Sequence, residues 1–156
     1  MTPSLVVDLD TADATVALGR SLGAILRAGD LVVLTGELGA GKTTLTRGIG
    51  EALGVRGPVT SPTFVIARRH PSLSNGPALV HVDAYRLGST AEIDDLDLDI
   101  EGAVTVVEWG AGRVEHLSDS WLLIDLREDG QGRCASIRPV GPRWDSVDFA
   151  LVLSAR

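Results

Sequence analysis

The chain has 156 residues, 44% hydrophobic and 22% charged, which predicts one globular domain with an ordinary core over residues 1–156. Its net charge of −7 argues against direct binding to DNA or RNA, which needs a basic stripe. No long apolar run predicts a membrane span, the N-terminus does not resemble a secretion signal, and the single cysteine, Cys134, excludes an internal disulfide. We therefore expect a cytoplasmic protein that does not enter a membrane.

Apolar residues recur at helical spacing in some segments and form short strand-like runs in others. In chain order we expect a strand at 4–8, a helix begun by the N-cap Thr11 and stopped by Gly29, a strand at 31–35, a helix at 43–53, strands at 63–69 and 78–83, a short helix at 91–97, and strands at 103–108, 121–127 and 133–138. Residues 144–153 fit either a helix or a strand. Helices alternating with apolar strands indicate an α/β fold, and the expected hairpins at 63–83 and 121–138 predict a mixed sheet.

A glycine-rich loop joins the strand at 31–35 to the helix at 43–53. From Gly36 to Thr43 it reads GELGAGKT, which matches the phosphate-loop pattern G-x-x-x-x-G-K-[ST]. Its glycines let the backbone N–H groups curl inward, and the following helix adds its positive end. We expect Lys42, the only lysine among 14 basic residues, to contact the β- and γ-phosphates, and Thr43 to coordinate magnesium.

Two apolar strands end in an acidic residue, Asp83 and Glu108. Ligands in open α/β sheets bind at the carboxyl ends of strands, so both carboxylates are candidates to reach the magnesium ion. The alternative for each is a solvated acid at a strand end. The hydroxyl-rich segment 60–63 fits either a loop that senses the γ-phosphate or an ordinary turn.

Three other residues and the identity of the base allow competing interpretations. Trp109 either stacks on a base or packs in the core, with the core favoured. His81 alternates with apolar neighbours, so we expect it to face away from the core and not to act as a ligand. Cys134 is expected to pack as a small apolar residue. Adenine is the expected base, because the guanine-reading pattern N-K-x-D needs a second lysine.

Four motifs occur together in a specific order: GELGAGKTT from residue 36, VTSPTF at 59–64, HVDAYRL at 81–87 and VVEWG at 106–110. Together they resemble the TsaE (YjeE) family over residues 11–138. The resemblance implies a P-loop NTPase-like three-layer fold with a mixed central sheet. It also implies an ATPase that uses ATP and Mg²⁺ in bacterial tRNA threonylcarbamoyladenosine synthesis. Such a protein has weak ATPase activity alone, acts with TsaD and TsaB, and contacts tRNA only indirectly, through that complex.

The family resemblance also assigns roles to individual residues. It implies catalytic roles for Lys42, Asp83 and Glu108, and magnesium contacts for Thr43, Glu108 and Asp83. The implied nucleotide-binding residues are Thr11, Glu37, Leu38, Gly39, Ala40, Gly41, Lys42, Thr43, Thr44, Trp109, Gly132 and Arg133. Of these, Thr11 near the N-terminus and the pair Gly132 and Arg133 in the late hairpin would close over the base.

Two other functions fit the phosphate loop. A small-molecule or nucleotide kinase would need an acceptor pocket and usually a lid with several arginines, for which only Arg68 and Arg69 offer a candidate. A nucleotide-gated assembly module would keep Lys42 and Thr43 but would not need Asp83 and Glu108. Measuring ATP turnover with and without partner proteins separates these functions from a partner-activated ATPase.

Overall fold

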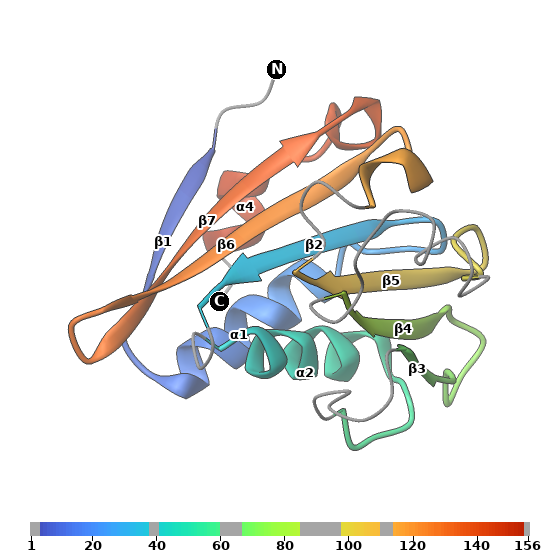
Figure 1. Cartoon of the computed structure of the whole chain (residues 1–156), viewed down its shortest axis with the longest axis horizontal. Helices are drawn as coiled ribbons and strands as arrows, with labels where there is room; N and C mark the ends of the chain where they lie inside the picture. The colour runs from blue at the N-terminus through green and yellow to red at the C-terminus, as the bar shows by residue number, and fades with distance from the viewer. Residues whose placement is uncertain (1–3, 38–40, 60–66, 85–97, 110–113, 155–156) are drawn as a thin grey trace.

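The computed structural model describes residues 4–37, 41–59, 67–84, 98–109 and 114–154. Within these ranges a twisted sheet runs through the molecule with helices packed against it (Figure 1). The elements are β1 (Leu5–Leu9), α1 (Ala12–Gly23), β2 (Leu31–Gly36), α2 (Lys42–Leu53), β3 (Ala67–His70), β4 (Ala78–Asp83), β5 (Ala103–Glu108), the 3-10 helix η1 (Glu115–Leu117), β6 (Trp121–Asp129), β7 (Gly132–Val140), the 3-10 helix η2 (Pro142–Trp144) and α4 (Phe149–Ser154).

The sheet has seven strands in the order β1-β7-β6-β2-β5-β4-β3. The four central strands, β6, β2, β5 and β4, are parallel to one another. The outer strands β1, β7 and β3 pair antiparallel with their neighbours. The sheet is therefore mixed, as the sequence predicts, and both expected hairpins are present.

Each face of the sheet carries a hydrophobic core. Helices α1, α2 and α4 cover one face, and their apolar residues pack there with those of the strands. On the other face, the buried side chains of β2, β4 and β5 pack with Val114, just before η1, and with Leu117, the last residue of η1. The helix expected at 91–97 lies outside the described residues. Both faces of β2, β4 and β5 are therefore buried, as is usual for parallel sheets, whereas one face of β6 is only half-buried.

Helices α1 and α2 cross at glycines, which fixes the position of the start of α2. A Cβ atom at Gly48 would overlap the carbonyl oxygen of Val16, and one at Gly19 would overlap that of Leu45. Only glycine allows the two backbones to approach this closely. Because α2 begins at the phosphate loop, this close packing ties the loop to the core.

The structure settles the expectations about three other segments. Helix α1 ends at Gly23, before the predicted stop at Gly29, because the N–H groups of Ile25 and Leu26 bond three residues back and tighten the chain. The C-terminal segment forms η2 and then α4. Cys134 is half-buried on β7. No described helix is both long and apolar enough to cross a bilayer.

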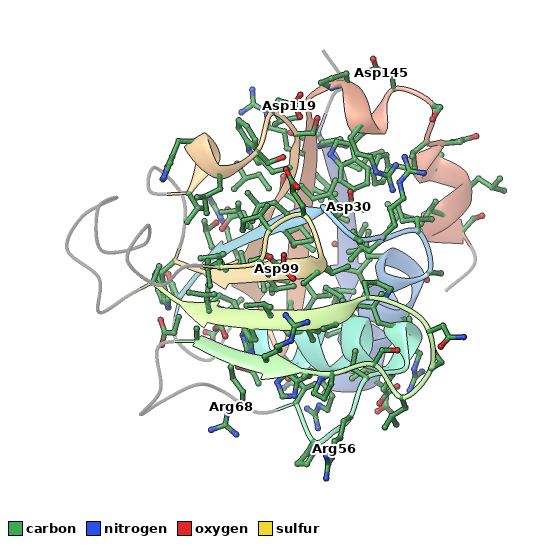
Figure 2. All side chains as sticks on the ribbon, turned by 90° about the vertical axis from the view of Figure 1, so that its right-hand side faces the viewer. Asp30, Arg56, Arg68, Asp99, Asp119 and Asp145 are labelled. Atoms are coloured by element: carbon green, nitrogen blue, oxygen red, sulfur yellow. The ribbon has the colours of Figure 1, made fainter. Side chains whose placement is uncertain are left out.

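A buried ion pair closes the end of the sheet where β2 begins, and Figure 2 faces this end with Asp30 labelled. Arg143, on η2, donates from Nε to Asp30 Oδ1 at 2.9 Å and from Nη2 to Oδ2 at 3.1 Å. The same Nη2 also donates to the Ile25 carbonyl, and the Arg27 N–H donates to Asp30. This pair links the C-terminal segment to the start of the central strand.

Candidate functional site

The glycine-rich loop leaves β2 and enters α2 through two residues with positive φ. Gly36 has φ of 137°, and a Cβ atom there would overlap the Leu126 carbonyl oxygen. Gly41 has φ of 104° and caps α2, which begins at Lys42, one residue before the predicted start. Leu38, Gly39 and Ala40 lie outside the described residues. The first N–H groups of α2 thus open onto the loop, where they suit an anion.

Lys42 is only 5% exposed and lies under the loop. Its Nζ donates to the carbonyl oxygens of Gly36 and Glu37, both at 2.9 Å. Burial lowers the pKa of this ammonium group, and the charges of Glu108 and Asp83 partly offset the shift. The loop therefore places a buried positive charge near two carboxylates.

These carboxylates end neighbouring parallel strands. Asp83 on β4 pairs in register with Glu108 on β5, and Glu108 is 6% exposed, whereas Asp83 is half-buried. The Trp109 N–H donates to the Leu34 carbonyl at 2.8 Å and fastens the end of β5 to β2. The carboxyl ends of β2, β4 and β5 thus meet at the phosphate loop, where ligands bind in open α/β sheets.

His81 does not face away from the core as we expected from its alternating neighbours. It is fully buried, and its Nε2 lies 2.5 Å from Glu108 Oε2. Its Nδ1 is buried without a hydrogen-bond partner in the described part of the chain. The expectation fails because β4 lies between β3 and β5 with both faces covered, so neither face of this strand points to solvent.

Trp109 follows Glu108 with φ of 63°, a conformation that only a few per cent of non-glycine residues adopt. Its ring lies against Lys42, with Nζ 4.3 Å from the ring centroid, and the residue is half-buried. It belongs to neither hydrophobic core, contrary to the favoured expectation. Backbone strain of this kind is concentrated at functional sites.

A pocket of about 290 Å³ adjoins the start of α2. It brings together five residues expected to contact a nucleotide: Thr11, Gly41, Thr44, Gly132 and Arg133. Sequence reasoning missed the other residues that line it, which are Leu9, Asp10, Ala12, Thr15 and Gln131. The pairing of β1 with β7, which sets Leu9 opposite Arg133, is the signal that links the two ends of the chain here.

Thr11 lies at this pocket because it caps α1. Its hydroxyl oxygen accepts a hydrogen bond from the Ala14 N–H at 3.1 Å, which confirms the predicted N-cap. Gly132 lies close to β1, where a Cβ atom would be 2.8 Å from the Leu9 carbonyl oxygen. The hairpin and the start of α1 therefore both line the pocket.

The oxygen groups near the loop fit magnesium held together with a phosphate. Thr43 is half-buried in the first turn of α2, and Glu108 and Asp83 end adjacent strands. No group of three or more His, Cys, Asp or Glu among the described residues is arranged to hold a metal by itself. Mg²⁺ typically takes one or two protein carboxylates and completes its shell with substrate phosphates and water. This donor set suits that mode.

Comparisons with known proteins identify the family. The family described as threonylcarbamoyl adenosine biosynthesis protein TsaE matches residues 9–135. A tRNA threonylcarbamoyladenosine biosynthesis protein TsaE from Streptomyces coelicolor is 57% identical over 143 residues, covering 86% of this chain and 97% of that protein. The protein of the same name from Bacillus subtilis is 35% identical over 138 residues, covering 86% and 85%.

A solved structure extends the similarity to the fold. The crystal structure of Bacillus subtilis YdiB superimposes with a TM-score of 0.78 at 30% identity, covering 99% of this chain and 97% of that one. The sequence matches and the fold thus agree over nearly the whole chain. The chain therefore belongs to the TsaE family of threonylcarbamoyladenosine biosynthesis proteins.

Proposed function

We propose that this protein is a Mg²⁺-dependent ATPase that acts with TsaB and TsaD in threonylcarbamoylation of tRNA. The modified base is the adenosine next to the anticodon in tRNAs that read codons starting with A. The main support is Lys42, a buried ammonium group under the phosphate loop with Glu108 and Asp83 nearby. The names of the relatives give the pathway.

The pocket adjoins the start of α2, which supports a nucleotide whose phosphates lie at the loop. Gly41 and Thr44 line the pocket and also lie at the start of α2, so phosphates on the loop leave the base and sugar beside Thr11 and Arg133. The net charge of −7 favours contact with tRNA through the partner proteins rather than directly. ATP is the proposed nucleotide because no guanine-reading motif accompanies the loop.

The residues at the loop divide the chemistry among them. Lys42 and the N–H groups of α2 balance negative charge on the terminal phosphates. Thr43 and Glu108 would hold Mg²⁺, which when bound polarises the phosphate oxygens. Asp83, which is less buried than Glu108, is better placed to orient a water molecule. Weak activity of the protein alone is expected until its partners complete the site.

ATP turnover measured with and without TsaB and TsaD tests the proposal. We expect strong stimulation by the pair, and we expect Asp83→Asn and Glu108→Gln to lower stimulated turnover at least about 100-fold while ATP still binds. Glu51→Gln is the matched control, because Glu51 lies on the exposed side of α2 and pairs only with Arg20 among the described residues.

Three outcomes of this assay would overturn parts of the proposal. Normal turnover by either acidic variant in the full complex would remove the role assigned to that residue. Tight ATP binding with no turnover under any condition would indicate a nucleotide-gated assembly module. Transfer of phosphate to a metabolite would indicate a kinase.

A further inference from the structure

His81 and Glu108 lie on the same face of adjacent strands, directly below the phosphate loop. On β4, Leu79 two residues before His81 belongs to the core under α1 and α2, and on β5, Val106 two residues before Glu108 belongs to the same core. Since side chains alternate along a strand, His81 and Glu108 both point to the side of the sheet that α2 covers. His81 therefore lies further from the carboxyl ends of the strands, and deeper in the protein, than the Glu108 carboxylate.

The contact between the two side chains is buried and specific. His81 Nε2 lies 2.5 Å from Glu108 Oε2, and the two side chains are 0% and 8% exposed. With the carboxylate ionised, the imidazole must carry its hydrogen on Nε2 and donate it to Oε2. Only the small accessible part of the Glu108 side chain then remains for a ligand that enters from the loop.

A purely structural role leaves one feature of this contact unexplained. The other ring nitrogen, Nδ1, is buried and has no partner among the described residues. Buried polar atoms are nearly always paired, and each exception calls for an explanation. An apolar side chain would fill this position on β4 without an unpaired nitrogen, whereas the histidine supplies a fixed N–H at the carboxylate.

Glu108 needs such a restraint because an opposite charge lies nearby. The charges of Glu108 and Asp83 both act on the Lys42 ammonium group, whose hydrogen bonds instead go to the carbonyl oxygens of Gly36 and Glu37. A carboxylate free to rotate would be drawn toward this ammonium group and would compete with a phosphate for it. A hydrogen bond to one carboxylate oxygen opposes that rotation.

We propose that His81 is a positioning residue, which holds Glu108 through the Nε2–H···Oε2 bond so that the carboxylate stays oriented for a divalent cation at the phosphate loop. The inference rests on the proposed function, since the cation is the one that Glu108 would share with a bound triphosphate. Mutation of a residue that orients a metal ligand without touching the metal typically lowers metal affinity or activity by about 10- to 100-fold.

The first test examines the contact in the ligand-free protein. The chain has three histidines, so ¹⁵N-histidine NMR resolves His70, His81 and His116 individually. We expect the His81 hydrogen on Nε2, and we expect Glu108→Gln to move the His81 signals while the His70 signals stay in place. A hydrogen on Nδ1 of His81, or His81 signals that do not respond to Glu108→Gln, would overturn the proposal.

The second test measures metal affinity without turnover. Mn²⁺ binding in the presence of AMP-PNP, followed by EPR, should weaken about 10- to 100-fold in His81→Leu. The affinity for AMP-PNP in the absence of metal should stay unchanged. His81→Gln, whose amide can place an N–H near the same oxygen, should recover most of the loss. His70→Leu removes the neighbouring buried histidine as a matched control and should bind Mn²⁺ like the wild type.

The outcomes separate a positioning role from a structural one. If His81→Leu and His81→Gln weaken Mn²⁺ binding equally, or if His81→Leu binds it normally, His81 does not position Glu108. If His81→Leu does not fold, the NMR experiment and His81→Gln still decide. If the wild-type protein binds neither AMP-PNP nor Mn²⁺, the proposed function fails, while the NMR signals still report whether His81 holds Glu108.

Discussion

Two buried pairs, each joining a carboxylate to a nitrogen-bearing side chain, lie at opposite ends of the parallel strands, and they differ in how completely they are satisfied. Arg143 and Asp30 close the end where β2 begins, which faces the viewer in Figure 2. His81 and Glu108 lie at the other end, where β5 meets the phosphate loop. Asp30 and Glu108 are similarly buried, at 4% and 6% exposure. Burial alone therefore does not distinguish a structural pair from a functional one.

Both ends have buried polar atoms without a described partner, among them Trp144 Nε1 beside Arg143, so the difference lies in the paired side chains themselves. At the Asp30 end, two guanidinium N–H groups and a backbone N–H bond the two carboxylate oxygens. At the loop end, His81 Nδ1 has no described partner, and the described hydrogen bonds of Lys42 go to carbonyl oxygens although carboxylates lie nearby. A closed hydrogen-bond network serves stability, whereas an open one has capacity left for a ligand.

Arg143→Met should have the largest effect on stability, because it leaves Asp30 buried without its partner. We expect the free energy of unfolding to fall by about 3 kcal/mol, with nucleotide affinity unchanged in the folded protein. Urea denaturation measures the loss. Arg127→Met is the matched control, since Arg127 pairs with Asp125 at a side-chain exposure of 78%, and it should cost less than about 1 kcal/mol. Equal losses in the two variants would show that the Asp30 end is not a closed structural pair.

Lys42→Met should act in the opposite way, on binding rather than on stability. Charge-assisted hydrogen bonds contribute about 1.5–3 kcal/mol, so ATP affinity should fall about 10- to 100-fold. Stability should not fall, since the variant removes a buried charge. Calorimetric titration with AMP-PNP and urea denaturation measure the two quantities. Arg47→Met, at an exposed position of the same helix, is the control. A destabilised variant with normal affinity would assign Lys42 to the structure alone.

Much of this architecture could be predicted from the sequence because it depends on local patterns. The glycines and Lys42 fix the loop, and the ends of β4 and β5 are marked by Asp83 and Glu108 after apolar runs. The Thr11 cap was predictable from its own side chain. The nucleotide and metal roles of these residues, and the roles of the segment 60–63, remain predictions.

What could not be predicted depends on neighbours that are distant in the sequence. The outward orientation that we expected for His81 was inferred from an alternating pattern. Alternation marks an exposed face only where one side of a strand is free. The contact of Trp109 with Lys42 depends on the left-handed backbone at residue 109, for which the sequence carries no signal. The pocket walls at Asp10 and Gln131 depend on the pairing of the first and last strands.

The smallest effect is expected at His70, which tests whether a buried histidine with an unpaired nitrogen always serves a ligand site. Like His81, it is buried and its Nε2 lacks a described partner, but its Nδ1 bonds the Arg56 carbonyl rather than a carboxylate. Burial lowers the pKa of His70, and the charges of His81 and Arg68 lower it further, against the opposing effect of the Arg56 carbonyl.

As the pH falls below about 6.5, the unfolded chain therefore takes up a proton at His70 before the folded protein does. The free energy of unfolding should fall across this range, until the pH passes below the pKa of His70 in the folded protein. His70→Gln should flatten that slope in urea denaturation between neutral and mildly acidic pH, with Mn²⁺ binding unchanged. If His70→Gln instead weakened Mn²⁺ binding, the two histidines would act together. The contact with a carboxylate would then not distinguish a histidine that positions a ligand from a structural one.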